Sequence, residues 1–164
     1  MSSQASSEQR DRDLAELAPW ISFLRAHAAI TRELSSRLEN QHGLTLSDYD
    51  VLVQLYFAPD RALRRIDLAR TVLLTASGIT RLLDGLERAG WVAKQRCESD
   101  ARVTYAKLTS AGAEKFERAR ATHLADVEEL FGSRFTRDEH ALLGELLGRL
   151  PLAATSPACT GERE

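Results

Sequence analysis

The sequence predicts a mainly α-helical fold that carries one small β-hairpin. Over most of the chain apolar residues recur every three or four positions, which is the period of an amphipathic helix. After Gly90 the period changes, and two short runs rich in β-branched, aromatic and basic residues, 92–96 and 103–108, flank the polar segment 97–101. The length of 164 residues suits one domain with additional helices better than it suits two domains.

The first forty residues predict one long helix. Residues 1–18 are expected to form a flexible or short helical lead. Pro19 has no N–H donor, so we expect it in the first turn of a new helix that spans about 19–41 and ends before Gly43. Its apolar stripe contains Ile21, Leu24, Ala28, Thr31, Leu34 and Leu38. A stripe of this length requires more than one packing partner.

Two shorter helices are expected next. Ser47 and Asp50 have the spacing of a capping pair, which predicts a second helix that starts there and stops before Pro59. Residues 62–64 are expected to be extended and to precede a third helix of about two turns.

Segment 76–88 predicts an amphipathic helix with two distinct faces. Thr75 stands at the N-cap position and Gly90 at the C-cap position. The apolar members fall at i, i+3, i+4 and i+7 and form one face: Ile79, Leu82, Leu83 and Leu86. The other face then carries small polar groups and cations, namely Ser77, Thr80, Arg81, Asp84 and Arg88.

The C-terminal third predicts two helices and a tail. Thr109 and Gly112 are expected to open a long helix. Thr136 and Glu139 have capping-box spacing before a leucine-rich last helix that Pro151 closes, and 151–164 is expected to be disordered.

Charge is distributed unevenly along the chain, although the net charge is only −2. Residues 61–107 hold 10 Lys/Arg and 5 Asp/Glu, whereas the flanking segments 1–60 and 108–164 have net charges of −4 and −3. A basic module between acidic ends is the pattern expected of a module that meets a polyanion. A chance excess of cations on a solvated face is the alternative.

The order of short helix, turn, capped amphipathic helix and basic hairpin predicts a winged helix-turn-helix over about 45–109. In that fold the second helix enters the major groove of duplex DNA and the hairpin lies along the backbone. The candidate DNA-binding residues are therefore Ser77, Thr80, Arg81, Asp84 and Arg88 on the helix, and Lys94, Arg96 and Arg102 on the hairpin. Arg102 is the residue that we expect in the minor groove.

Several segments resemble the MarR (multiple antibiotic resistance regulator) family of transcription factors. These are Leu68-Ala69, residues 77–92, Asp100-Ala101-Arg102 and Leu108-Thr109-Ser110-Ala111-Gly112. The resemblance covers about 19–150 and implies one domain. It implies an obligate homodimer that reads a pseudo-palindromic operator, with repression relieved by a small molecule. Family members often have Arg where this chain has Gly85 and Ala101, which implies fewer phosphate contacts.

The predicted terminal helices, about 19–41 and 110–150, independently favour a homodimer. Their apolar surface is larger than a winged domain of about 65 residues can bury. A helical bundle formed by two copies of the chain would bury the rest. A monomeric helical domain with the same core is the alternative.

Three residues are candidates for binding an effector. The residues around Tyr49-Asp50, Pro59 and Leu63-Arg64 are similar to the urate-responsive branch of the family, which uses a Trp, an Asp and Arg residues around an aromatic anion. Trp20, His27 and Asp50 are the candidates here. Each has a structural alternative: dimer packing for Trp20, a surface or core position for His27, and helix capping for Asp50.

The sequence argues against catalysis and against a cofactor or metal. Nucleophile-elbow, P-loop and zinc-protease motifs do not occur, and the four His residues lack a paired carboxylate array. Cys97 and Cys159 are too few for a disulfide framework, and a redox role for Cys97 is unsupported. No stretch approaches the apolar length of a membrane span, so a cytoplasmic location is expected. A winged-helix module that binds proteins and not DNA is the rival function.

Overall fold

The computed structural model describes residues 2–72, 76–96 and 103–150, and it has the mainly helical architecture with a small sheet that the sequence predicts. Its elements in chain order are α1 (Ser2–His42), α2 (Leu46–Phe57), η1 (Pro59–Arg61), β1 (Ala62–Arg64), α3 (Arg65–Thr71), α4 (Ala76–Arg88), β2 (Val92–Arg96), β3 (Thr104–Leu108), α5 (Ser110–Leu130), η2 (Gly132–Arg134) and α6 (Arg137–Gly148).

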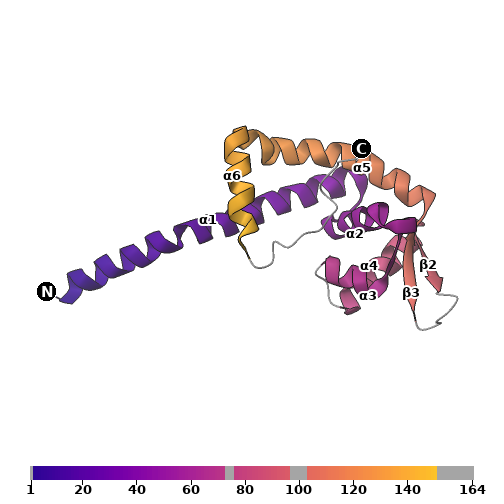
Figure 1. Cartoon of the computed structure of the whole chain (residues 1–164), viewed down its shortest axis with the longest axis horizontal. Coiled ribbons are helices and arrows are strands. Elements are labelled where there is room, and N and C mark those ends of the chain that lie inside the picture. Colours follow the sequence, from indigo (N-terminus) through magenta and orange to yellow (C-terminus); the bar gives the residue numbers. More distant parts are fainter. Residues whose placement is uncertain (1, 73–75, 97–102, 151–164) are drawn as a thin grey trace.

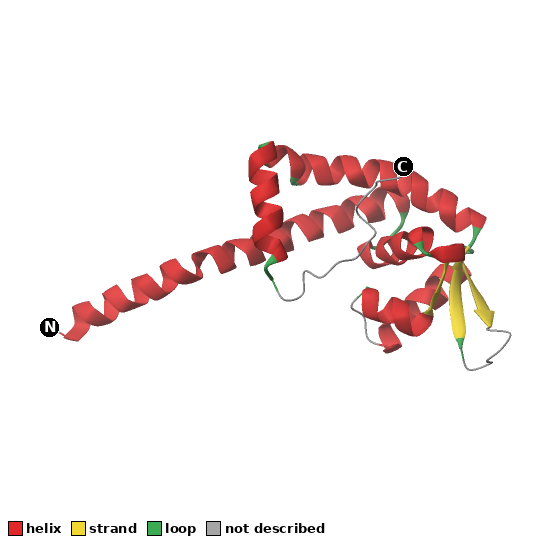
Figure 2. Ribbon diagram, in the orientation of Figure 1, coloured by secondary structure: helices red, strands yellow, loops and turns green. Residues whose placement is uncertain are grey.

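The elements separate into two groups in space. Helices α2, α3 and α4 and the sheet lie together at one end of the molecule, while α5 runs beside the C-terminal half of α1 and leads to α6 (Figure 1). The N-terminal half of α1 projects away from both groups (Figure 2). The predicted lead is therefore helical and continuous with the long helix.

The apolar core fills the end that contains the sheet. Side chains from α2, α3, α4 and β3 meet those of the first half of α5, and the largest fully buried ones include Leu52, Leu68, Leu83 and Phe116. Complete burial of such a side chain contributes roughly 1.5–3 kcal/mol. This core fixes α3 and α4 relative to the sheet.

Two sequence predictions about helix starts are wrong. Helix α1 passes through Pro19, because one proline removes a single hydrogen bond and the surrounding residues are good helix formers. Helix α2 is capped by Thr45 and not by Ser47: the Thr45 hydroxyl accepts from the Asp48 N–H at 3.1 Å, and Asp48 accepts from the Thr45 N–H at 2.9 Å. Asp50 consequently has no capping role.

The sheet has one strand more than the predicted hairpin. Strands β2 and β3 pair antiparallel from Val92↔Leu108 to Arg96↔Thr104. The extended segment β1 pairs with the other edge of β3, from Ala62↔Lys107 to Arg64↔Tyr105, which gives the order β1-β3-β2. The end of β1, and α3 directly after it, are thereby held beside the first residues of β3.

The C-terminal helices begin as predicted. Thr109 caps α5 by accepting from the Gly112 N–H, and Thr136 and Glu139 form the capping box of α6. The predicted cap Thr75, hairpin tip 97–101 and tail 151–164 lie outside the described residues.

Candidate nucleic-acid interface

The inward face of α4 is buried as the sequence predicts. Ile79, Leu83 and Leu86 are 3%, 1% and 1% exposed, and Leu82 packs half-buried against the same core. Gly90 ends the helix with φ +76°, a conformation that glycine adopts without strain. The Trp91 N–H then donates to the Leu86 carbonyl at 2.9 Å. The core and this cap together fix which face of α4 points outward.

The outward face of α4 carries the predicted polar and cationic side chains. Thr80, Arg81 and Arg88 are exposed, and Asp84 is half-buried. Arg88 Nε donates to the Asp84 carbonyl at 3.2 Å, whereas Arg81 forms no ion pair within the described part of the chain. Ser77 lies in the first turn of α4, and its side chain is outside the described structure.

Lys94 connects the hairpin to this helix, which the sequence did not predict. Its Nζ lies 2.7 Å from a Glu87 oxygen and 2.9 Å from Asp84 Oδ1. The hydrogen bonds to Glu87 and then Asp84 raise the pKa of Lys94, and the bond from Lys94 lowers the pKa of Asp84. The charge of Lys94 is thus largely compensated by two carboxylates of α4. Of the other hairpin cations, Arg96 is exposed at the end of β2, and Arg102 lies outside the described residues.

The first turn of α5 is seated on the chain between α4 and β2. The Thr109 hydroxyl donates to the carbonyls of Gly90 at 2.7 Å and Trp91 at 3.1 Å, and the Thr109 N–H donates to the Trp91 carbonyl at 3.1 Å. A Cβ added to Gly112 would lie 2.1 Å from that Trp91 oxygen. The close approach explains why the Leu108–Gly112 motif needs glycine at its end.

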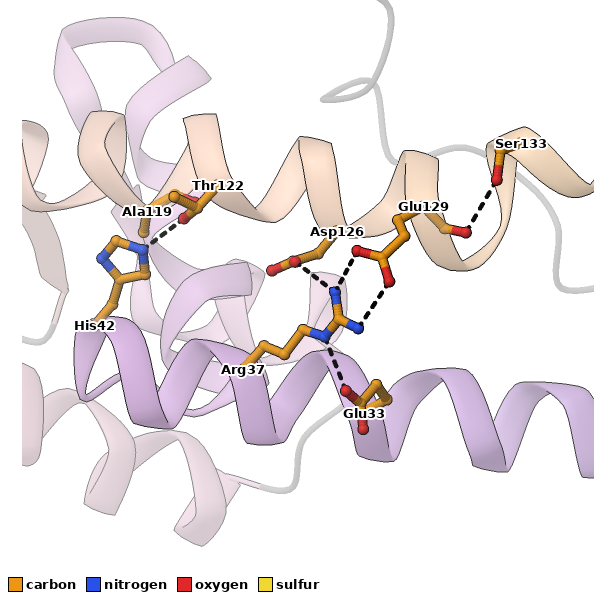
Figure 3. A network of polar contacts seen from close by, with 8 residues as sticks. All are labelled: Glu33, Arg37, His42, Ala119, Thr122, Asp126, Glu129 and Ser133. Carbon is orange, nitrogen blue, oxygen red and sulfur yellow. Dashed lines mark hydrogen bonds and ion pairs between the residues drawn. The ribbon is translucent and has the colours of Figure 1, made fainter.

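An arginine-centred network joins α5 to α1 (Figure 3). Arg37 Nη1 lies 2.8 Å from Asp126 and 2.9 Å from Glu129, and Arg37 Nε lies 2.8 Å from Glu33. The hydrogen bond to Glu129, followed by those to Glu33 and Asp126, raises the pKa of Arg37. Sequence reasoning missed this network. Only the Glu33 partner, four residues away on the same helix, gives a local signal.

Two histidines lie at the junction of α1, α2 and α5. His42 Nε2 is 2.6 Å from the Thr122 hydroxyl, as Figure 3 shows, and the Lys115 ammonium donates to the His42 carbonyl. His123 packs on the Tyr49 ring at 4.5 Å between centroids, and its Nδ1 is buried without a hydrogen-bond partner in the described part of the chain. Burial lowers the pKa of both histidines.

The three candidate effector residues do not meet at one site. The Trp20 ring stacks on Phe23, and Phe23 stacks on His27, with centroid distances of 6.1 and 6.2 Å. His27 lines an apolar groove of about 490 Å³ whose other walls include Phe131, Phe135, Leu143 and Leu147. Asp50 is on α2, where it accepts from Gln54 at 3.4 Å and burial raises its pKa. It does not line that groove.

The fold and the outward surface of α4 define a winged helix-turn-helix DNA-binding protein, with α3 and α4 as the helix-turn-helix and β2–β3 as the wing. A family model described as MarR family matches residues 42–103. A MarR family transcriptional regulator from Streptomyces coelicolor, solved in complex with DNA, is similar over 81% of this chain and 83% of that chain, with 31% identity and a TM-score of 0.78. The chain belongs to the MarR family of transcriptional regulators.

Other relatives agree with this assignment. A mutant MarR from E. coli complexed with operator DNA has 26% identity and a TM-score of 0.69, over 82% of this chain and 93% of that chain. The HTH-type transcriptional regulator MhqR of Bacillus subtilis is 28% identical over 135 residues, 82% of this chain and 90% of its own length. These relatives are transcriptional regulators and not enzymes, so this protein is a DNA-binding regulator. Across the described ranges, no helix has the length and apolar character to cross a membrane.

Proposed function

We propose that the protein is a homodimeric, cytoplasmic repressor that reads operator bases with the outward face of α4 and is released by a small aromatic or anionic ligand. The observation that supports base reading is the exposure of Thr80 and Arg81 on the face opposite the buried Ile79 and Leu83. Arginine in the major groove recognises guanine through two hydrogen bonds, and the hydroxyl of threonine accepts or donates to either base edge.

The remaining candidate DNA contacts have different proposed roles. Ser77 precedes Thr80 by one helical turn and would enter the groove with it. Arg88, Arg96 and Arg102 would contact backbone phosphates or the minor groove. Lys94 and Asp84, which pair with each other at 2.9 Å, would hold the hairpin at a fixed angle to α4.

The test is a fluorescence-anisotropy titration with the protein's own upstream DNA and with single-base variants of the bound site. We expect Arg81→Ala to reduce discrimination at one base-pair position of each half-site by about 1–3 kcal/mol. Arg102→Ala should weaken binding to all sequences about equally. Arg120→Ala on α5, which removes the same charge far from α4, is the control. Failure of the wild type to bind at low salt, where phosphate contacts are strongest, would contradict the proposal.

The homodimer proposal is supported by apolar side chains that one chain leaves exposed. On α1, Trp20 is 56% exposed and Leu24 is 43% exposed, and on α6, Leu142 is 54% exposed and Leu146 is 44% exposed. The groove between these helices is also apolar. Contiguous apolar surface of this kind marks interaction sites in soluble proteins, and a two-fold arrangement would cover the same patch on both copies.

Light scattering during gel filtration tests this proposal. The wild type should have twice the mass of the chain, and Leu146→Glu should have the mass of one chain and lose operator affinity. Glu145→Gln, one residue earlier on α6, is the control for a charge change at an exposed position. A monomeric wild type would refute the homodimer.

The effector proposal rests on the stacked rings of Trp20, Phe23 and His27, of which Phe23 and His27 line the apolar groove. A ligand that binds only the folded protein raises its melting temperature by mass action. We expect urate or salicylate to stabilise the wild type and not Trp20→Ala, and to displace operator DNA. If neither compound stabilises the wild type or displaces DNA, the effector proposal fails. The ring stack would then serve dimer packing alone, and Asp50 would have no proposed role in ligand binding.

A further inference from the structure

A cavity lies where β1 passes into α3, next to the start of β3. It has a volume of about 380 Å³ and is lined by Arg64, Arg65, Ile66, Val103 and Thr104. The sheet register brings these residues together, because Arg64 at the end of β1 pairs with Tyr105 near the start of β3. We call it the Arg64–Arg65 cavity.

The cavity is cationic, and one of its lining arginines has an unmatched hydrogen-bond donor. Arg65 Nη2 is buried and has no hydrogen-bond partner among the residues that the structure describes. A buried donor without an acceptor is unfavourable, so a rotation of the Arg65 side chain that brings Nη2 to an external oxygen in the cavity would be favoured. The neighbouring Arg64 has a long 3.8 Å contact between its Nε and Asp67, with both side chains about half exposed, which leaves its guanidinium available to a stronger anion.

The surroundings place this cavity at the DNA-facing end of the molecule. Its walls include the first residues of the β3 side of the hairpin, and α3, α4 and the sheet lie together at that end (Figure 1). Arg65 is also close to α4: after the bond from Lys94, the charge of Arg65 contributes to the lowered pKa of Asp84. The cavity therefore adjoins the tip side of the wing, where Thr104 pairs with Arg96, and its Arg65 interacts electrostatically with α4, the helix proposed for the major groove.

In a winged helix-turn-helix complex, one DNA strand must pass between the groove that holds the helix and the groove beside the wing. We propose that the Arg64–Arg65 cavity binds a backbone phosphate of that strand, with Arg65 and Arg64 as donors to its oxygens. Two adjacent guanidinium groups match a phosphate geometrically, since each presents paired N–H donors. This inference rests on the proposed DNA-binding function and adds a site that the outward face of α4 does not include.

The salt dependence of operator binding tests the proposal. The slope of log K against log salt concentration is negative, and each lost phosphate contact reduces its magnitude by about 0.9 on duplex DNA. Replacing both arginines by glutamine removes one phosphate contact from each half-site, so it should reduce the magnitude of the slope by about 1.8 for a dimer, without changing the preferred sequence. Arg65→Gln and Arg64→Gln alone should each give a smaller reduction. Arg64 is exposed, so its variant keeps the test valid should Arg65→Gln fail to fold. Arg120→Gln on α5 is the matched control and should leave the slope unchanged.

A second measurement separates the DNA backbone from a free anion. Inorganic phosphate is titrated into wild type and both variants, and the melting temperature is recorded. Slopes of smaller magnitude in the variants than in the wild type support the proposal. Unchanged slopes overturn it, and stabilisation of only the wild type by phosphate would then assign the cavity to a free anion. Failure of the proposed function is a different result: in that case the wild type does not bind operator DNA at all.

Discussion

Replacing Gly112 by alanine tests whether the contact between α5 and the wing is as close as the structure has it. The added Cβ would lie 2.1 Å from the Trp91 oxygen and 2.8 Å from Leu108 Cδ1. The Trp91 oxygen belongs to the backbone and accepts two hydrogen bonds from Thr109, so it cannot move away independently. Overpacking of this kind costs about 1–3 kcal/mol, and the backbone contact places Gly112→Ala at the upper end.

The gain in helix propensity opposes this cost. Alanine is preferred to glycine in a helix by at most about 1 kcal/mol, so the net loss for Gly112→Ala is about 2 kcal/mol. Gly85→Ala on α4 is the matched control, because a Cβ there meets nothing within 4 Å. It should gain about 1 kcal/mol, which separates the two variants by about 3 kcal/mol.

Urea unfolding followed by far-ultraviolet circular dichroism measures both changes. Protein concentration must be held fixed, since the proposed dimerisation would contribute to apparent stability. A Gly112→Ala variant as stable as the wild type would show that α5 has room to approach Trp91 differently, and the close packing inferred for this motif would be wrong.

Three further predictions concern the cap, the histidine and the ion network. Thr45→Ala should destabilise the protein by about 1 kcal/mol and Ser47→Ala should have little effect in the same urea assay; the reverse order would restore Ser47 as the cap. Burial lowers the pKa of His123 in the folded protein below its value in the unfolded chain. The neutral His123 therefore contributes stability above about pH 6.5 that is lost as the pH falls through the folded pKa. His123→Phe should make the melting temperature less dependent on pH between pH 7 and 5, and a variant with the same pH dependence as the wild type would exclude His123 as the cause. Arg37→Gln should lower the melting temperature, and the difference from wild type should shrink as NaCl is raised; a constant difference would mean that packing and not charge is lost.

Helix α4 and the hairpin were predictable because their signals are local. Four apolar residues at helical spacing define the buried face of α4, and Gly90 has the positive φ that its position requires. The choice between Thr45 and Ser47 was not decidable locally, because both stand three residues before an aspartate. The structure starts α2 at Leu46 and buries the preceding Leu44 completely, a tertiary contact that has no sequence period.

Contacts between distant segments account for what sequence reasoning missed. Strand β1 has only three residues, and its pairing partner is more than 40 residues away. Arg37 meets Asp126 and Glu129 across 89 and 92 residues. The Arg64–Arg65 cavity exists only because that β1 pairing forms, so neither arginine stands out among the ten cations of the basic segment.

The hydrogen bonds from Thr109 have a consequence for engineering DNA specificity. The backbone of one residue, Trp91, connects the end of α4, through its N–H, with the first turn of α5, through its carbonyl, at the start of the wing. A chimera that transplants a foreign recognition helix and hairpin would break this shared contact if the graft stopped at the last strand. The exchangeable unit therefore extends through Gly112, and swaps that end before Thr109 should yield proteins in which the winged helix-turn-helix is misaligned relative to α5.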